Sequence, residues 1–132
     1  KQNISLVKAL NAGMEDFTGY KPLQERVNLL YYSDFFIGLA SGLSWLAWAC
    51  GKPVVLISGF SLPYTEFYTP YRIINYNVCN GCFNDVNSWD VRVDVCPCSG
   101  TVKYLECSRK IDHRVVIQNI KQLMKDNHCM VK

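Results

Sequence analysis

The sequence lacks the features that would place it in a membrane or on a secretory route. No stretch approaches the roughly 20 consecutive apolar residues that a membrane-spanning helix needs. The first residues, KQNISLVKAL, contain neither the long apolar region nor the cleavage site of a signal peptide. We therefore expect a protein of a bacterial cytoplasm or a eukaryotic cytosol. Because the first residue is Lys1 rather than Met, we also expect the chain to be a fragment of a longer protein.

Familiar catalytic and nucleotide-binding motifs are also missing. The chain contains neither a Walker loop nor a G-x-G-x-x-G turn, and no Ser-His-Asp or Cys-His arrangement is evident. Its two histidines, His113 and His128, fall in or after the last expected helix and are interpreted as surface residues. We therefore expect no catalytic base within this chain.

Charge of one sign is not concentrated anywhere. The 132 residues carry 14 basic and 11 acidic side chains, a net charge of +3, without a basic run of the kind that binds nucleic acid or membranes. A hydrophobic content of 49% with 19% charged residues indicates one modest globular domain over residues 1–132. Charge therefore identifies no partner.

The stretch 33–61 is typical of two strands joined by a helix. Residues 35–39 and 54–57 are short apolar runs suited to strands buried on both faces. A crossover through one helix makes such strands parallel, which predicts an α/β fold with a Rossmann-like parallel sheet. Ligands of parallel sheets bind beyond the carboxyl ends of the strands, so the expected site is the turn 40–44.

The helix between these strands is expected to begin near Ser41 or Leu43 and to end at Gly51, since Pro53 prevents its continuation. It is apolar on all sides, which indicates either burial under another element or a contact surface in an oligomer or between domains. Free backbone N–H groups at its start could hold a phosphate, with hydroxyls of Ser41 and Ser44 as further donors. Alternatively, Ser41 only caps the helix.

The remaining elements are expected on either side of this unit. A strand at 14–17 precedes a turn, and Pro22 begins a helix with one apolar face. Residues 72–76 suit a third strand, and a cysteine-held insertion of two hairpin-like pieces is expected at 78–108. Asp112 caps a last helix. The apolar faces of the first and last helices are expected to consist of Leu23, Val27, Leu30 and Tyr31, and of Val116, Ile117, Ile120, Leu123 and Met124.

Seven cysteines are many for this length, and five of them lie between Cys79 and Cys107. Cys79 and Cys82 form a C-N-G-C knuckle, and Cys96 and Cys107 can supply two more thiolates for a closed, structural zinc or iron site. Cys98 competes with Cys96 as the third ligand, and the proline directly after Cys96 favours Cys96. Two disulfides are the alternative, but the odd total and the clustering favour a metal.

An aromatic loop follows the second strand of the central unit. Its residues Tyr64, Phe67, Tyr68 and Tyr71 could stack on a base or a sugar, or could form a small core beneath the loop. Glu66 could orient a sugar hydroxyl or could simply be solvated.

Residues 16–60, DFTGYKPLQERVNLLYYSDFFIGLASGLSWLAWACGKPVVLISGF, resemble the C-terminal nucleotide-sugar domain of ADP-heptose-dependent heptosyltransferases. The matching pattern is T-G-x-x-x-L, an apolar strand, D-[ST]-G-x-x-H, an Ala-rich helix and G-x-P-x-V. With the segment CNGCFND and the later CP and EC pairs, the resemblance narrows to bacterial autotransporter heptosyltransferases. Those enzymes transfer heptose from ADP-heptose to serine hydroxyls of autotransporter adhesins. The resemblance implies the C-terminal half of a two-Rossmann-domain, or GT-B, glycosyltransferase in a bacterial cytoplasm.

The resemblance also implies roles for individual residues in donor binding. The turn that holds the donor diphosphate is matched by Ser41, Gly42, Leu43 and Ser44. A position close to the donor nucleotide is matched by Lys21.

The family's metal finger, to which iron is assigned, is matched by Cys79, Cys82, Cys96 and Cys107. Cys98 is extra to that finger. Two positions depart from the broader heptosyltransferase pattern: Ala40 stands where lipopolysaccharide enzymes carry Asp, and Trp45 where they carry His. These departures favour the protein-modifying branch of the family.

The resemblance finally implies which functions depend on residues or proteins outside this chain. The catalytic base, an Asp in the family, is expected in a missing N-terminal domain, so the chain alone should bind ADP-heptose weakly and not catalyse transfer. Family members form large homo-oligomers together with their substrate, so the expected partners are further copies and an autotransporter adhesin. The alternatives are a lipopolysaccharide-type heptosyltransferase domain, a non-catalytic metal-stapled interaction module and, suggested only by the cysteine knuckle, a nucleic-acid binder.

Overall fold

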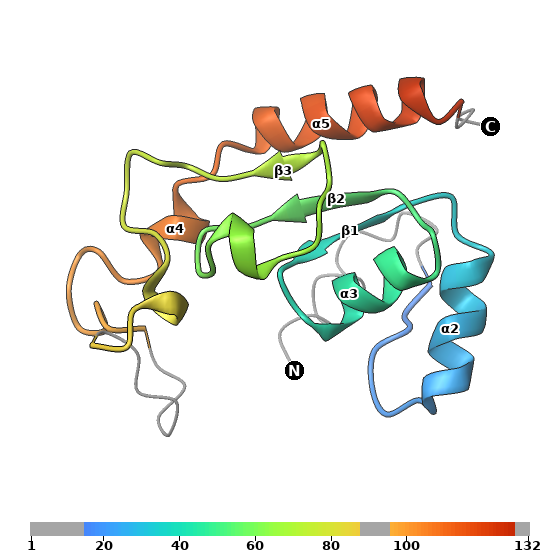
Figure 1. The fold of residues 1–132 in the computed structure, drawn as a ribbon, viewed down its shortest axis with the longest axis horizontal. Coiled ribbons are helices and arrows are strands. Elements are labelled where there is room, and N and C mark those ends of the chain that lie inside the picture. The colour runs from blue at the N-terminus through green and yellow to red at the C-terminus, as the bar shows by residue number, and fades with distance from the viewer. Residues whose placement is uncertain (1–14, 88–95, 129–132) are drawn as a thin grey trace.

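The computed structural model of the protein describes residues 15–87 and 96–128. The helices and strands of this part are α2 (Leu23–Tyr31), β1 (Phe36–Leu39), α3 (Gly42–Ala49), β2 (Val54–Ile57), β3 (Arg72–Ile73), α4 (Glu106–Arg109) and α5 (His113–Asp126). Two short 3-10 helices, η1 (Pro63–Thr65) and η2 (Cys82–Asn84), lie in the connections. The strands form one parallel sheet in the order β1-β2-β3 (Figure 1).

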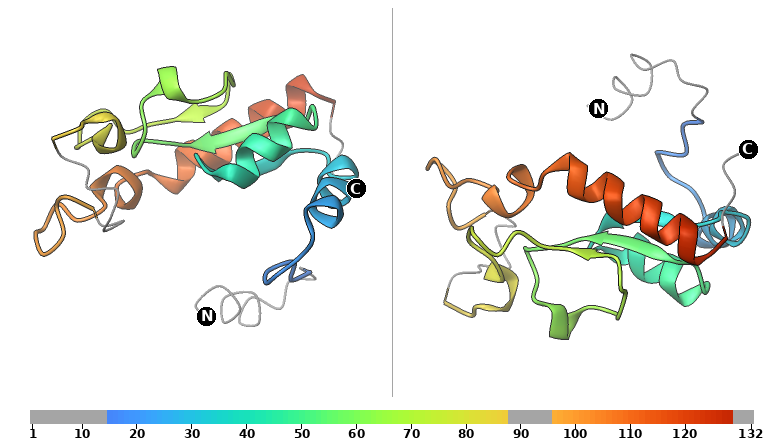
Figure 2. Two further views of the ribbon diagram at one scale, coloured as in Figure 1. Left: turned by 60° about the horizontal axis from the view of Figure 1, so that its bottom comes forward. Right: turned by 90° about the horizontal axis from the view of Figure 1, so that it is seen from above.

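The central strand β2 is buried on both faces of the sheet. Val54 and Leu56 belong to a hydrophobic cluster that includes Ala47 of α3. Val55 points the other way and belongs to a second cluster that includes Leu123 of α5. Helices α3 and α5 therefore cover opposite faces of the sheet (Figure 2).

The predicted strand–helix–strand unit is confirmed. Strands β1 and β2 pair in parallel from Phe36 opposite Val54 to Leu39 opposite Ile57. Helix α3 ends before Gly51, whose φ of 72° is left-handed and suits glycine.

The predicted start of the last helix is also confirmed. Asp112 is the N-cap of α5, and its carboxylate accepts a hydrogen bond of 2.8 Å from the backbone N–H of Arg114. This bond satisfies one of the N–H groups that the first turn of a helix leaves without a partner.

Three predicted elements differ from the structure. The strand expected at 14–17 is wrong for its described residues 15–17, which form no strand, and residue 14 lies outside the described part. The third strand is confined to Arg72–Ile73, because Asn75 turns the chain by accepting a hydrogen bond from the N–H of Asn77. Where the structure describes the segment 78–108, it contains η2 and α4 rather than hairpins; residues 88–95 lie outside that description.

The inward faces of two helices are narrower than predicted. Leu23 and Tyr31 of α2 are 67% and 64% exposed, because α2 reaches the core only through Leu30 at its end. Ile117 of α5 is 46% exposed, whereas Val116 and the other predicted residues of α5 pack on the sheet.

Helix α3 presents an uncovered apolar face within the described part of the chain. Ala47 and Ser44 are buried against the sheet, whereas Leu43, Trp45 and Trp48 are exposed. The two indole rings meet edge to face at 5.9 Å. The sequence indicated either a helix buried under another element or a contact surface. The exposed face agrees with the contact surface.

No helix of the described residues is long and apolar enough to span a bilayer.

We expect β2 to control the stability of the fold. Leu56→Ala should lower the free energy of unfolding by about 2–5 kcal/mol, because Leu56 is fully buried between β2 and α3 and its truncation leaves a cavity. Urea denaturation followed by tryptophan fluorescence measures the change. Val86→Ala, at a position that is 91% exposed, is the control and should change stability by less than about 0.5 kcal/mol. Equal effects of the two substitutions would contradict this prediction.

Candidate functional site

A cavity of about 310 Å³ lies at the carboxyl ends of β1 and β2. The end of β1 and the turn into α3 form one wall, the end of β2 and its loop form a second, and the cysteine segments with α4 form the third. The lining residues are Leu39, Ala40 and Ser41; Ile57, Ser58 and Phe60; and Cys82, Cys96, Leu105, Cys107 and Ser108. The arrowheads of β2 and β3 in Figure 1 point toward η2 and α4, as expected for a site at this edge.

The first turn of α3 begins at the rim of this cavity. Ser41 precedes it in an extended conformation, with φ −138° and ψ 170°, and its side chain makes no capping hydrogen bond. The first backbone hydrogen bond of the helix joins the N–H of Trp45 to the carbonyl of Ser41 at 3.2 Å. Helix geometry therefore leaves the N–H groups of Gly42, Leu43 and Ser44 without carbonyl partners inside the helix. Such N–H groups, together with the helix dipole, favour an anion.

The side chain of Ser44 stabilises the fold and is not available to a ligand. It is fully buried, and its hydroxyl donates to the carbonyl of Leu39 across the crossing of β1 and α3. The crossing is tight, since a Cβ at Gly38 would lie 2.9 Å from the Ser44 Oγ. Only the backbone N–H of Ser44 is left for a ligand.

The other residues predicted to bind the donor lie outside the lining of this cavity. Gly42 and Leu43 line a shallow groove between α2 and α3. The ammonium group of Lys21 pairs with Glu25 at 2.6 Å and lies 5.7 Å from the centre of the Phe17 ring. Of the five predicted residues, the structure thus places Ser41 in the cavity wall.

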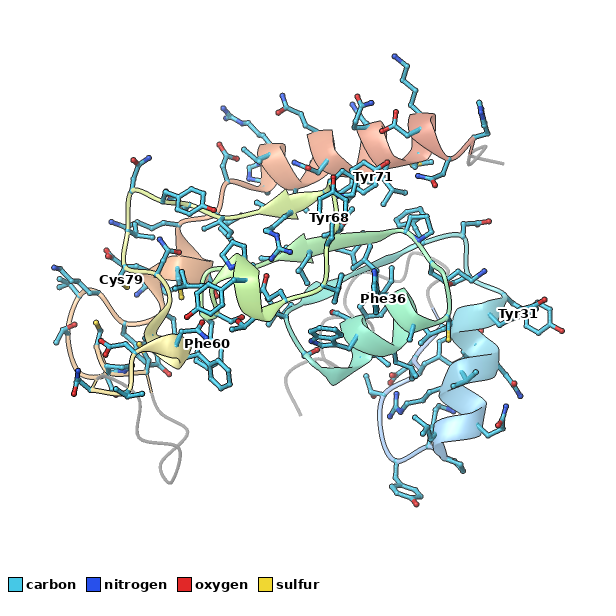
Figure 3. All side chains as sticks on the ribbon, viewed as in Figure 1. Tyr31, Phe36, Phe60, Tyr68, Tyr71 and Cys79 are labelled. Atoms are coloured by element: carbon cyan, nitrogen blue, oxygen red, sulfur yellow. The ribbon has the colours of Figure 1, made fainter. Side chains whose placement is uncertain are left out.

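Backbone hydrogen bonds fasten the first cysteine knuckle to the loop after β2. The N–H of Gly81 donates to the carbonyl of Gly59 at 2.8 Å, and the N–H of Phe83 donates to that of Phe60 at 3.1 Å. The rings of Phe60 and Phe83 also contact each other, with centres 5.1 Å apart. Phe60 and Cys79 accordingly lie at the same end of the molecule in Figure 3.

Two glycines allow this close approach. Gly81 has a φ of 73°, and a Cβ there would lie 2.7 Å from the Cγ of Leu62. Gly59 has a φ of 140°, and a Cβ there would lie 3.1 Å from the Cβ of Cys107. A side chain at Gly81 would therefore have to displace Leu62, and one at Gly59 would crowd Cys107.

The five clustered cysteines lie near one another in part: Cys82 is near Cys79, Cys96 and Cys107, and Cys98 is near Cys79 and Cys96. Burial raises the pKa of Cys82, and the nearby Cys107, Cys96 and Cys79 raise it further. Loss of solvent also raises the pKa of Cys98, and its interactions with Cys79 and Cys96 raise this pKa further. None of the six cysteines that the structure describes forms a disulfide, so the disulfide alternative has no support there.

The chemistry of this cluster suits a soft metal, because thiolates prefer iron or zinc to hard cations. Three of the predicted ligands, Cys82, Cys96 and Cys107, line the same cavity. Over residues 15–87 and 96–128, however, no three His, Cys, Asp or Glu side chains are arranged closely enough to hold a metal ion. Among the described residues, three thiols therefore line one cavity but are not close enough together to hold a metal ion.

The sequence analysis missed a buried ion pair beside the cavity. The interpretation of Glu66 as a solvated residue was wrong, because its side chain is only 2% exposed and pairs with Arg72 of β3. The role of orienting a sugar hydroxyl stays a prediction. The carboxylate also accepts hydrogen bonds from the hydroxyls of Ser58 and Ser61. Burial lowers the pKa of Arg72, and Tyr76 partly offsets this effect. Two serines and a glutamate within the nine residues after a buried strand were the signal that could have indicated the network.

The four aromatic residues of the loop after β2 were predicted either to stack on a ligand or to form a small core. Phe67 and Tyr71 are buried in the two hydrophobic clusters, as a small core requires. Tyr64 and Tyr68 are exposed. His113 is an exposed residue beside Asp112, as predicted.

Comparison with known proteins identifies relatives over most of the chain, although no protein-family model matches it. The autotransporter heptosyltransferase BAHTCr of Citrobacter rodentium is 53% identical over 129 residues, which are 91% of this chain and 32% of that protein. The autotransporter heptosyltransferase TibC of Escherichia coli is 57% identical over 102 residues, or 75% of this chain and 25% of TibC. BimC of Burkholderia thailandensis, described as an inactive autotransporter heptosyltransferase, is 44% identical over 77% of this chain and 25% of BimC.

The fold agrees with these sequence matches. A crystal structure of TibC, described as a dodecameric iron-containing heptosyltransferase in complex with ADP-D-β-D-heptose, matches 92% of this chain with a TM-score of 0.76 and 47% identity. The predicted resemblance to autotransporter heptosyltransferases is confirmed. The chain covers 33% of that TibC structure and spans a third or less of the curated relatives it matches.

The packing around Gly81 generates a prediction for the knuckle. Gly81→Ala and Gly100→Ala both force alanine into a left-handed conformation, which costs roughly 1–2 kcal/mol. Only Gly81→Ala should also displace Leu62, because a Cβ at Gly100 meets no atom within 4 Å. Scanning calorimetry should therefore show a lower melting temperature for Gly81→Ala than for Gly100→Ala. Equal melting temperatures would mean that the knuckle does not depend on this contact.

Proposed function

We propose that this chain is the donor-binding, C-terminal Rossmann-like domain, residues 1–132, of a GT-B glycosyltransferase. The reaction transfers heptose from ADP-heptose to serine hydroxyls of an autotransporter adhesin. The observation that carries the proposal is the first turn of α3, which begins at the rim of a cavity at the carboxyl ends of two parallel strands. Further support comes from the heptosyltransferase relatives and from the presence of ADP-heptose in the TibC structure.

The donor diphosphate binds at the start of α3 in this proposal. The backbone N–H groups of Gly42, Leu43 and Ser44 and the hydroxyl of Ser41 donate to its oxygens, and the helix dipole adds a favourable field. Gly42 suits this role because the space around its Cα is open. Lys21 interacts with the nucleotide, as the family resemblance implies.

The chemical step needs two kinds of assistance. A serine hydroxyl attacks the anomeric carbon while ADP leaves, so negative charge grows on the diphosphate and the hydroxyl must lose a proton. The N–H groups of α3 stabilise the growing charge. The general base is an Asp outside this chain. The chain by itself therefore binds the donor but does not catalyse heptose transfer.

The segment 78–108 is proposed to be a structural metal finger with Cys79, Cys82, Cys96 and Cys107 as ligands. Iron is the proposed metal, since TibC is described as iron-containing, and zinc is the alternative. A closed four-thiolate site supplies folding energy rather than catalysis. Its effect here would be to hold η2 and α4 against the cavity.

The proposed partners are an autotransporter adhesin as acceptor and further copies of the full-length protein, in a bacterial cytoplasm. TibC is described as dodecameric. The exposed face of α3, with Leu43, Trp45 and Trp48, supplies apolar area suited to such contacts.

A non-catalytic role is the second candidate. BimC, which is 44% identical, is described as inactive, so similarity over this segment does not by itself imply turnover. A metal-stapled interaction module would use the same sheet and finger without binding a nucleotide. The lipopolysaccharide-type alternative is disfavoured by Ala40 and Trp45, which replace the Asp and His of that branch.

Donor binding at the start of α3 is testable by calorimetry. ADP-heptose, with ADP and GDP-mannose as controls, is titrated into the purified chain and into its Gly42→Trp and Gly42→Ala variants. The wild type should bind the two adenine ligands and not GDP-mannose. Gly42→Trp should weaken binding by at least about tenfold, because the indole fills the space of the diphosphate, whereas Gly42→Ala should bind like the wild type.

Unchanged affinity in Gly42→Trp would exclude this position for the diphosphate. A folded, metal-loaded full-length protein that binds none of the three ligands would favour the interaction module instead.

The ligand set is testable by metal analysis of purified variants. Cys96→Ser should lose most of the bound iron, because three thiolates hold the ion less tightly than four, whereas the matched variant Cys98→Ser should retain it. Mass spectrometry of the metal content gives the stoichiometry. Loss of iron from Cys98→Ser but not from Cys96→Ser would make Cys98 the third ligand. Retention of iron by both variants would exclude both cysteines as ligands.

A further inference from the structure

The network around Glu66 joins three segments at the side of the cavity. Its carboxylate accepts from the Ser58 hydroxyl at 2.5 Å, where β2 ends, and from the Ser61 hydroxyl within the loop. Its other oxygen pairs with Arg72 in β3. The same guanidinium donates to the carbonyl of Phe67 at 2.6 Å. The Glu66–Arg72 pair therefore fastens both ends of the loop 58–67, Ser58 through Glu66 and Phe67 through Arg72.

One member of this network belongs to the cavity wall. Ser58 and Phe60 line the cavity, as does Ser41 at the start of α3. The Ser58 backbone N–H donates to the carbonyl of Ile73 at 2.9 Å, which fixes its main chain to β3. Glu66 then fixes its side chain, so the position of this wall depends on a residue that does not itself line the cavity.

Burial makes the network sensitive to its charge. Glu66 and Arg72 have side chains that are 2% and 15% exposed, so neither charge can be solvated if the other is removed. Hydrogen bonds to an ionised carboxylate are also stronger than those between neutral groups. An amide in place of the carboxylate would leave the guanidinium buried without a counter-charge and would release the loop.

We infer that Glu66 is a positioning residue for donor binding: through Ser58 and the loop 58–67 it sets the cavity wall that faces the start of α3. This inference rests on the proposed function, because the ligand concerned is ADP-heptose. It assigns Glu66 no contact with the sugar or the nucleotide.

The test measures steady-state transfer from ADP-heptose by the full-length protein and its variant Glu66→Gln. A displaced wall should raise the donor KM by about tenfold while kcat changes by less than about twofold. A purely structural role would lower the fraction of active enzyme, and hence the apparent kcat, without changing KM. Asp126→Asn is the matched control, since that carboxylate also accepts from a hydroxyl, that of Tyr71 at 3.0 Å, but lies on α5 away from the cavity.

A second variant keeps the inference testable if Glu66→Gln fails to fold. Ser61→Ala removes one hydroxyl from the Glu66 carboxylate without adding volume or touching the cavity lining. It should raise the donor KM by about threefold, since one hydrogen bond of three is lost. A donor KM unchanged in both folded variants would overturn the inference and leave the proposed function intact. Absence of donor binding by the wild-type protein would overturn the proposed function, and the inference with it.

Discussion

Burial of β2 on both faces is the constraint on which the rest of this structure depends. A strand with apolar side chains on both sides must have a layer on each face, and α3 and α5 supply those layers. Because β1 and β2 are parallel, the chain must cross over through α3, and the crossover begins at the carboxyl edge of the sheet. The N–H groups of α3 therefore meet the loop after β2 at one edge, and the cavity lies there.

The cysteine segments reach that edge through main-chain contacts. Residues 59 and 60 hydrogen-bond to residues 81 and 83, and glycines at 59 and 81 leave room for the approach. The thiols of Cys82, Cys96 and Cys107 then complete the third wall of the cavity. Within the described part of the chain, Ser41 of the proposed donor site and three cysteines of the proposed metal finger thus line one cavity, so a change in the finger would alter the cavity wall beside Ser41.

Local signals in the sequence were enough for the elements that local chemistry determines. The crossover, the end of α3 before Gly51 and the Asp112 cap follow from residues within a few positions of each other. Ile117 and Leu23 were misplaced because helical spacing marks an apolar face but not how much of it the sheet can cover. Glu66 was misread because Arg72 reaches it from a separate strand, and the sharing of one cavity by Ser41 and the cysteines depends on loops that no periodicity describes.

The aromatic rings around Trp48 give the molecule an optical property. Its indole stacks on Phe67 with centres 5.6 Å apart, and the Trp45 ring stands nearly perpendicular to both. Chromophores held this close in a fixed chiral arrangement couple their electronic transitions, which produces circular dichroism in the near ultraviolet. Because Phe67 ends the loop that Arg72 fastens, this intrinsic signal reports the order of that loop without any added label.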